Sequence, residues 1–253
     1  MVEVTVVVAI IALLVGIFIP TAQAVRHQSY ITQCAANLQQ IGLAMTSYVT
    51  ENRTLPMTRY EPRAALFAGT GIKAADPFAI DGPVPNDVTA SIQLLRRSQK
   101  MNADVFVCPF SDTDRSVADK IDARRQANFT NYKRNLGYSF AVGYSQTGKP
   151  VRATRVLSRS FVLASDINPG MAGVGDNVML PTTESTTRQL RMANSANHAK
   201  DGQNVLFGDG HVEWASTAFV GPMEDNIFTN RRGETWAGPV DDLDVLLLPT
   251  DDR

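Results

Sequence analysis

The chain has 253 residues, 44% of them hydrophobic, and a formal net charge of −1 at pH 7. This composition favours one ordinary folded domain with an appendage over a disordered chain or a fibre. Because nucleic-acid-binding proteins concentrate Lys and Arg on one face, the balanced charge also argues against nucleic acid as a partner.

The first predicted element is an apolar segment near the N-terminus. The sixteen residues Val4–Ile19 carry no charge and end before Pro20. A span needs about 20 apolar residues, so flanking residues must contribute, and we expect the true start to lie upstream of the present one. We predict a transmembrane half-helix over residues 1–23. A cleaved signal peptide, for which Ala22–Ala24 offers an Ala-x-Ala site, and a buried core helix remain alternatives.

Beyond Pro20 the hydrophobic pattern changes rather than stops. Apolar residues recur every three or four positions, which places them on one stripe of a helix. They are Ile31, Cys34, Leu38, Ile41, Met45 and Tyr48. We therefore predict an amphipathic half over residues 24–51, continuous with the first half, in a helix on the order of 75 Å long. Pro20 would bend this helix, because it lacks a backbone donor and crowds the preceding turn.

Glu3 places a carboxylate at the start of the apolar segment. A charge in hydrocarbon costs roughly 2.5 to 3.5 kcal/mol on insertion scales, so it calls for a partner or a purpose. Either Glu3 lies at the membrane interface, where the helix dipole favours it, or another subunit supplies its charge partner.

The remainder, residues 52–253, is predicted to be a globular α+β domain. The stretch between Pro56 and Val88 is rich in Pro, Gly and Asp, which indicates a long loop. A short helix follows over Thr89–Gln99, with Asp87 or Thr89 as its N-cap.

Strands are expected where β-branched and aromatic residues cluster between turn formers. These runs are Val105–Cys108, Leu136–Val142, Ser160–Ser165 and a last strand within Leu243–Pro249. Asn204–Phe207 and His211–Trp214 flank an Asp-Gly pair, which is typical of a tight hairpin. A long helix packed on an antiparallel sheet is an α+β arrangement.

The N-terminal residues resemble those of type IV pilins and type II secretion pseudopilins. In that family a prepilin peptidase removes a short basic leader, the new N-terminus is methylated, and a Glu precedes a Pro by seventeen residues. Glu3 and Pro20 keep that spacing, although the leader is absent from this sequence. The resemblance implies a single-pass protein of the inner membrane with a periplasmic C-terminal domain, although Arg26 and His27 after the span would suggest the opposite orientation by loop charge alone.

Three further segments resemble the planctomycete-type pilin-like proteins that carry an H-x9-DG processing-associated motif. They are Gln33–Pro56, Ser91–Asp114 and Asn197–Trp214. The motif residues are His198, Asp209 and Gly210, and ten residues rather than nine separate His198 from Asp209.

Together the resemblances imply a structural subunit rather than an enzyme. It would assemble through its N-terminal helix, with other copies and other pseudopilins, into a pseudopilus or a pilus-like filament. In that assembly Glu3 would neutralise the free amine of a neighbouring subunit. A membrane-tethered extracytoplasmic module that binds a glycan or a protein is an alternative function.

Several side chains suggest chemistry without a decisive pattern. A metal-dependent hydrolase would gather His198, Asp201, Asp209 and His211, but no signature such as HExxH supports it. Calcium could be held by oxygen donors at Asp201, Asn204 and Asp209, and otherwise we expect no cofactor. Cys34 and Cys108 could form one disulfide in an oxidising compartment or remain two buried thiols.

Overall fold

The computed structural model describes residues 2–110, 118–170 and 181–251, and it gives no side-chain description for residues 18–24. The side chain of Pro20 and residues 111–114 of the second resembling segment therefore lie outside the described residues. The described chain forms an α+β fold in which a long N-terminal helix packs on a five-stranded antiparallel sheet.

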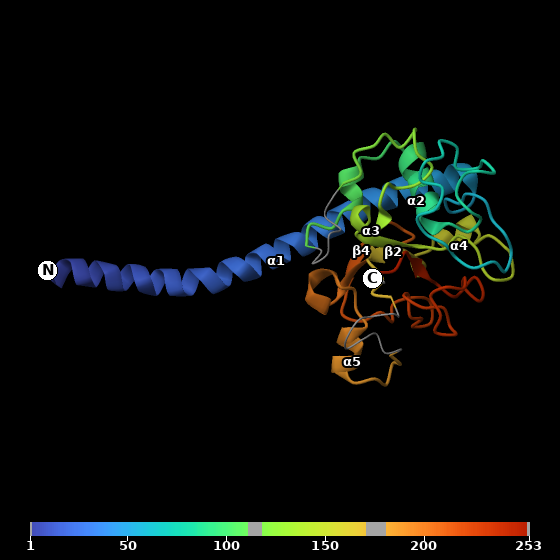
Figure 1. Ribbon diagram of the computed structural model, residues 1–253. Helices are drawn as coiled ribbons and strands as arrows, with labels where there is room; N and C mark the ends of the chain where they lie inside the picture. Colours follow the sequence, from blue (N-terminus) through green and yellow to red (C-terminus); the bar gives the residue numbers. More distant parts are fainter. Residues whose placement is uncertain (1, 111–117, 171–180, 252–253) are drawn as a thin grey trace.

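The helix α1 runs without interruption over Val2–Asn52. This confirms the predicted continuous helix, whose expected end at Glu51 was one residue short. Figure 1 shows α1 as a gently curved helix that projects far from the globular part with its first half and lies along it with its second half.

The two halves of α1 have different surroundings. All described side chains over residues 2–17 are exposed, including every large apolar one, whereas residues 25–52 alternate between exposed and buried. Among the residues that the structure describes, no helix combines the length and the hydropathy needed to cross a membrane.

The predicted apolar stripe of α1 is the face that docks on the sheet. Five of its members are buried, namely Cys34, Leu38, Ile41, Met45 and Tyr48, and Ile31 is partly buried. Gly42 lets the helix approach the sheet closely, since a Cβ built there would lie 2.8 Å from Leu206 Cδ1.

The sheet has the strand order β4-β3-β2-β1-β5. Its strands are β1 (Tyr138–Ala141), β2 (Val162–Asp166), β3 (Gln203–Phe207), β4 (Val212–Ala215) and β5 (Leu247–Leu248). Every neighbouring pair is antiparallel, and β3 and β4 form the predicted hairpin. The predicted strands at 136–142, 160–165 and 243–249 are confirmed in position, with shifted or narrower bounds.

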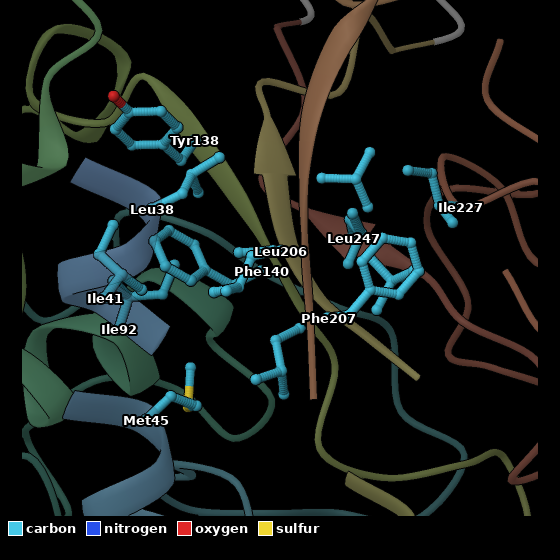
Figure 2. Close-up of a cluster of buried hydrophobic side chains, with 14 of the residues drawn as sticks. Leu38, Ile41, Met45, Ile92, Tyr138, Phe140, Leu206, Phe207, Ile227 and Leu247 are labelled. Atoms are coloured by element: carbon cyan, nitrogen blue, oxygen red, sulfur yellow. The ribbon is translucent and has the colours of Figure 1, made fainter. Parts of the chain in front are cut away.

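The hydrophobic core lies between α1 and the sheet. Figure 2 shows Leu38, Ile41 and Met45 of α1 facing Phe140 of β1 and Leu206 of β3. Leu38, Ile41 and Leu206 have no exposed surface. Burying an aliphatic side chain of this size stabilises a fold by about 1.5 to 3 kcal/mol, so the helix is a structural part of the domain.

The helix α2 spans Val88–Ser98 and covers the far end of α1. Asp87 is its N-cap and accepts a hydrogen bond from Ala90 N at 2.9 Å, which decides between the two predicted caps. Residues 53–87, all of them described, contain turns and an isolated bridge but no helix or strand, as the Pro- and Gly-rich composition predicted.

The predicted strand at Val105–Cys108 is wrong. Residues Ala103–Phe106 form the 3-10 helix η1 instead. Asn102 accepts a hydrogen bond from Asp104 N and so starts a turn, and the apolar residues that follow are buried by packing on α1 rather than by pairing with a strand. The other short helices were not predicted: α3 (Tyr132–Asn135), α4 (Ala153–Val156), α5 (Thr187–Met192) and the 3-10 turn η2 (Asn197–Lys200).

Candidate functional site

Four side chains from four separate segments converge beside the docked half of α1. Cys34 comes from α1, Cys108 follows η1, Asp166 ends β2, and His198 lies in η2. Each offers one sulfur, oxygen or nitrogen atom, and these four atoms all lie within 4.8 Å of one another. All four residues are 0% exposed. We call this set the buried cluster.

The two cysteines meet because the backbone around Cys108 packs tightly on the start of β1. Gly137 makes this approach possible, since a Cβ built there would lie 2.5 Å from Cys108 N. Its N–H donates a hydrogen bond to Phe106 O at 2.8 Å. Cys34 reaches the same place from the buried stripe of α1, and its Sγ lies 2.7 Å from Cys108 Sγ, both as free thiols.

Asp166 is held in one orientation by two asparagines. Its Oδ2 accepts hydrogen bonds from Asn204 N at 2.6 Å and from Asn204 Nδ2 at 3.2 Å. Its Oδ1 accepts a bond from Asn197 Nδ2 at 3.4 Å. These donors compensate the burial of a carboxylate, which would otherwise be costly.

His198 is presented by an unusual backbone. His198, Ala199 and Lys200 have φ values of 55°, 57° and 61°, a left-handed turn that residues with a Cβ rarely adopt. The imidazole stacks on Phe110 and meets the edge of Trp214, at centroid distances of 5.7 Å in both cases. Its Nε2 lies 3.5 Å from Asp166 Oδ2 and 3.8 Å from Cys108 Sγ.

The charges of the buried cluster depend strongly on one another. Burial opposes a charge on the His198 imidazole, but its hydrogen bonds to Asp166 and Cys34 more than offset that effect and raise its pKa to about 9. The hydrogen bond from Cys108 lowers the pKa of Cys34 to about 7 against the effect of burial, with help from His198. Burial, followed by the neighbouring Cys34, raises the pKa of the Cys108 thiol.

The site residues predicted from the sequence do not all lie together in the structure. Cys34, Cys108 and His198 come together, but His211 and Asp209 lie at the hairpin turn at the other end of β3, where they pair with each other and are partly exposed. Asp201 is paired at the surface with Arg191. The structure therefore does not assemble the proposed hydrolase residues into one site.

The three calcium candidates are also apart. Asp201 precedes β3 and Asp209 follows it, while the side chain of Asn204, within the strand, donates to Asp166 and to Ile31 O. Gly210, with φ of 91°, makes the tight turn that the Asp-Gly pair predicted. Glu3 is exposed in the first turn of α1.

The residue that sequence reasoning missed is Asp166. The predicted strand Ser160–Ser165 stops one residue short of Asp166, which ends β2 and is not among the predicted site residues. The available signal was a carboxylate two positions after the apolar run 161–164, because an acid at the end of a core strand needs a partner.

Compared with protein families, with curated proteins and with solved structures, the chain has no match. The chemistry of the site therefore has to be argued from its own atoms. Two thiols, a carboxylate and an imidazole can bind a metal ion, and two adjacent thiols can be oxidised. None of the four residues has surface to offer a substrate.

Proposed function

We propose that the chain is a membrane-anchored structural subunit of the type IV pilin-like class, which assembles with copies of itself or related subunits through α1. The observation that carries this proposal is the division of α1 into a projecting apolar half and a docked amphipathic half. A folded domain gains nothing from a projecting segment whose large apolar side chains are all exposed to water, so this half calls for a lipid or protein environment.

The projecting half suits a membrane in composition. Residues 2–17 contain Glu3 as their only charged residue, and they form about 24 Å of helix at 1.5 Å per residue. Phe18 and Ile19 continue the apolar sequence toward the roughly 30 Å of a hydrocarbon core. The anchor would thus comprise the first 23 residues, and the domain would lie on the periplasmic side of the inner membrane.

The docked half leaves apolar surface for neighbouring subunits. Leu43 is 75% exposed and Val25 is 68% exposed, on the sides of α1 that do not face the sheet. In a bundle of helices these side chains would pack on other copies. Glu3 would then lie in the apolar interior of the bundle and would pair with the amine of a neighbour. No catalysis is part of this proposal, because the buried cluster is closed to substrates.

Membrane anchoring is tested with one charge placed on the projecting helix. Ile11→Asp introduces a carboxylate into the apolar half, and Ile80→Asp introduces the same carboxylate at a side chain that is 95% exposed in a loop. An acid at the centre of a span costs about 2.5 to 3.5 kcal/mol, so we expect roughly 100-fold weaker membrane insertion for Ile11→Asp. Fractionation of cells that express the full chain measures this.

The Ile80→Asp chain is the control and should remain in the membrane fraction like the unaltered protein. If the unaltered chain is recovered in the soluble fraction with its N-terminal helix intact, the anchor is not real. If Ile11→Asp partitions as Ile80→Asp does, the helix is not embedded.

Assembly is tested at the acid in the first turn. Glu3→Ala removes the proposed partner of the neighbouring amine, and Glu51→Ala removes an exposed acid at the other end of α1. Breaking one side of a buried ion pair costs about 3 to 5 kcal/mol, so we expect Glu3→Ala to abolish oligomers that Glu51→Ala retains. Crosslinking in membranes measures them, and equal oligomer yields from both variants would refute the pairing.

A further inference from the structure

We propose that the buried cluster binds one zinc ion through Cys34, Cys108, Asp166 and His198. The ion would be structural, since it would fasten α1 to the sheet and to the segment after η1. This site goes beyond the proposed membrane subunit and does not depend on it, because all four ligands lie in the docked half of α1 or in the domain that it packs on.

The donor set suits zinc better than the hard cations. Calcium and magnesium take oxygen ligands, whereas thiolates and imidazole select zinc among the common divalent ions. Two thiolates and one carboxylate carry a charge of −3, and the imidazole is neutral. The zinc ion would reduce the net charge of the site to −1, so the buried anions would be compensated better than without it. The imidazole would bind through Nε2, which faces the other donors, and carry its proton on Nδ1.

Two of the three short distances within the cluster already fit a tetrahedral site. Bonds of about 2.0 to 2.3 Å place neighbouring ligand atoms about 3.3 to 3.8 Å apart. Nε2 of His198 lies 3.5 Å from Asp166 Oδ2 and 3.8 Å from Cys108 Sγ. The two sulfurs, at 2.7 Å, would have to separate by about 1 Å to reach the spacing of two metal-bound thiolates.

The groups around the cluster hold its ligands in place. Asn204 and Asn197 fix the carboxylate of Asp166, and Phe110 and Trp214 fix the plane of the His198 ring. Metal sites are commonly supported in this way by the groups behind their ligands.

The left-handed backbone at His198, Ala199 and Lys200 adds a further argument. Such conformations cost on the order of 1 to 3 kcal/mol per residue and persist where the surrounding structure requires them. They place the imidazole against the carboxylate and the thiols. A disulfide between Cys34 and Cys108 would use the two sulfurs alone and would give no reason for His198 and Asp166 to point at the same spot.

The experiment measures metal in the full chain, purified in detergent without chelator and with reductant present from cell lysis. We expect about one zinc ion per chain by elemental analysis. Exchange for cobalt should give the intense visible bands of a tetrahedral site and the near-ultraviolet bands of thiolate ligation. His198→Ala should lose the metal, and His211→Ala, which alters the exposed His–Asp pair at the hairpin turn, should retain it.

A second variant, which replaces His198 by another ligand, distinguishes loss of metal binding from loss of the fold. His198→Cys offers another soft donor and should keep both the fold and the zinc. In the unaltered chain, zinc should protect both thiols from alkylation until a chelator is added. A reduced chain without metal, or a chain in which mass spectrometry finds Cys34 joined to Cys108, would overturn the proposal. Loss of membrane association by the anchor variant would leave the zinc content unchanged, so the two proposals fail separately.

Discussion

The two halves of α1 are one helix in two environments. Residues 2–17 expose every large apolar side chain, whereas the docked half buries Leu38 and Ile41 completely and exposes Leu43. The backbone is helical throughout, so helix formation does not distinguish the halves. The arrangement of the apolar residues distinguishes them. In the projecting half the apolar residues surround the helix, so no single face docks on the domain, whereas in the docked half they form one stripe that packs on the sheet.

The largest contrast should come from shortening one leucine in each half. Leu38 is 0% exposed and Leu14 is 61% exposed. Leu38→Ala leaves a cavity between α1 and the sheet, and we expect it to lower the free energy of unfolding of the domain by about 2 to 5 kcal/mol. Leu14→Ala should leave that free energy unchanged.

Denaturant unfolding of the full chain in detergent, followed by tryptophan fluorescence, measures both leucine variants. Equal losses from Leu38→Ala and Leu14→Ala would mean that the projecting half also stabilises the domain, and the division of α1 would have to be abandoned.

A smaller contrast is expected at the two glycines of α1. A Cβ at Gly42 would lie 2.8 Å from Leu206 Cδ1, whereas a Cβ at Gly16 meets nothing within 4 Å. We expect Gly42→Leu to push the helix away from β3 and to cost about 1 to 3 kcal/mol. Gly16→Leu should cost the domain nothing, and the same unfolding measurement decides. Stability unaffected by Gly42→Leu would show that the close approach is unnecessary.

The smallest expected effect is a change of stability with pH. It should affect the domain and the docked half of α1, and not the projecting half. Burial raises the pKa of Asp225 to about 6, and the neighbouring Asp244 contributes to the rise. The pKa of Asp225 in the folded state lies above its unfolded value of about 3.9. The folded state therefore binds the proton more tightly, and this contribution to stability is fully present at low pH. Its stability then falls as the pH rises through 6.

We expect a loss on the order of 1 kcal/mol between pH 4 and 7, since the carboxyl group is partly exposed and screened. Asp225→Asn should flatten this dependence, because an amide does not titrate. The fold should tolerate the change, since the amide oxygen can still accept the hydrogen bond from Val245 N. Asp242→Asn, at an exposed carboxylate, should leave it in place. Membrane retention should not change over this range. A domain whose stability rises from pH 4 to 7 would contradict the assignment.

The parts of the fold that follow a local pattern could be predicted from the sequence. The 3.6-residue stripe of Cys34 and Leu38 gave the docked face of α1, and the Asp-Gly pair gave the β3–β4 hairpin. The prediction of a strand at Val105–Cys108 was wrong, because the same apolar residues are compatible with a strand and with a buried turn. Packing on α1 decides between these two structures.

The candidate site could be predicted only in part. Residue type singles out Cys34, Cys108 and His198 in the sequence, but Asp166 does not stand out, because one acid at the end of a predicted strand is a weak signal by itself. The convergence of these residues depends on the order of strands in the sheet and on the left-handed turn at His198, and neither leaves a pattern in the sequence.

The uninterrupted backbone of α1 also has a mechanical consequence. No loop separates the projecting tip from the docked segment, so a continuous helical backbone connects the tip to the domain. A torque applied at the tip would reach the contacts between Gly42 and Leu206 directly. Identical chains held side by side by their tips would therefore present their hairpins in a common direction.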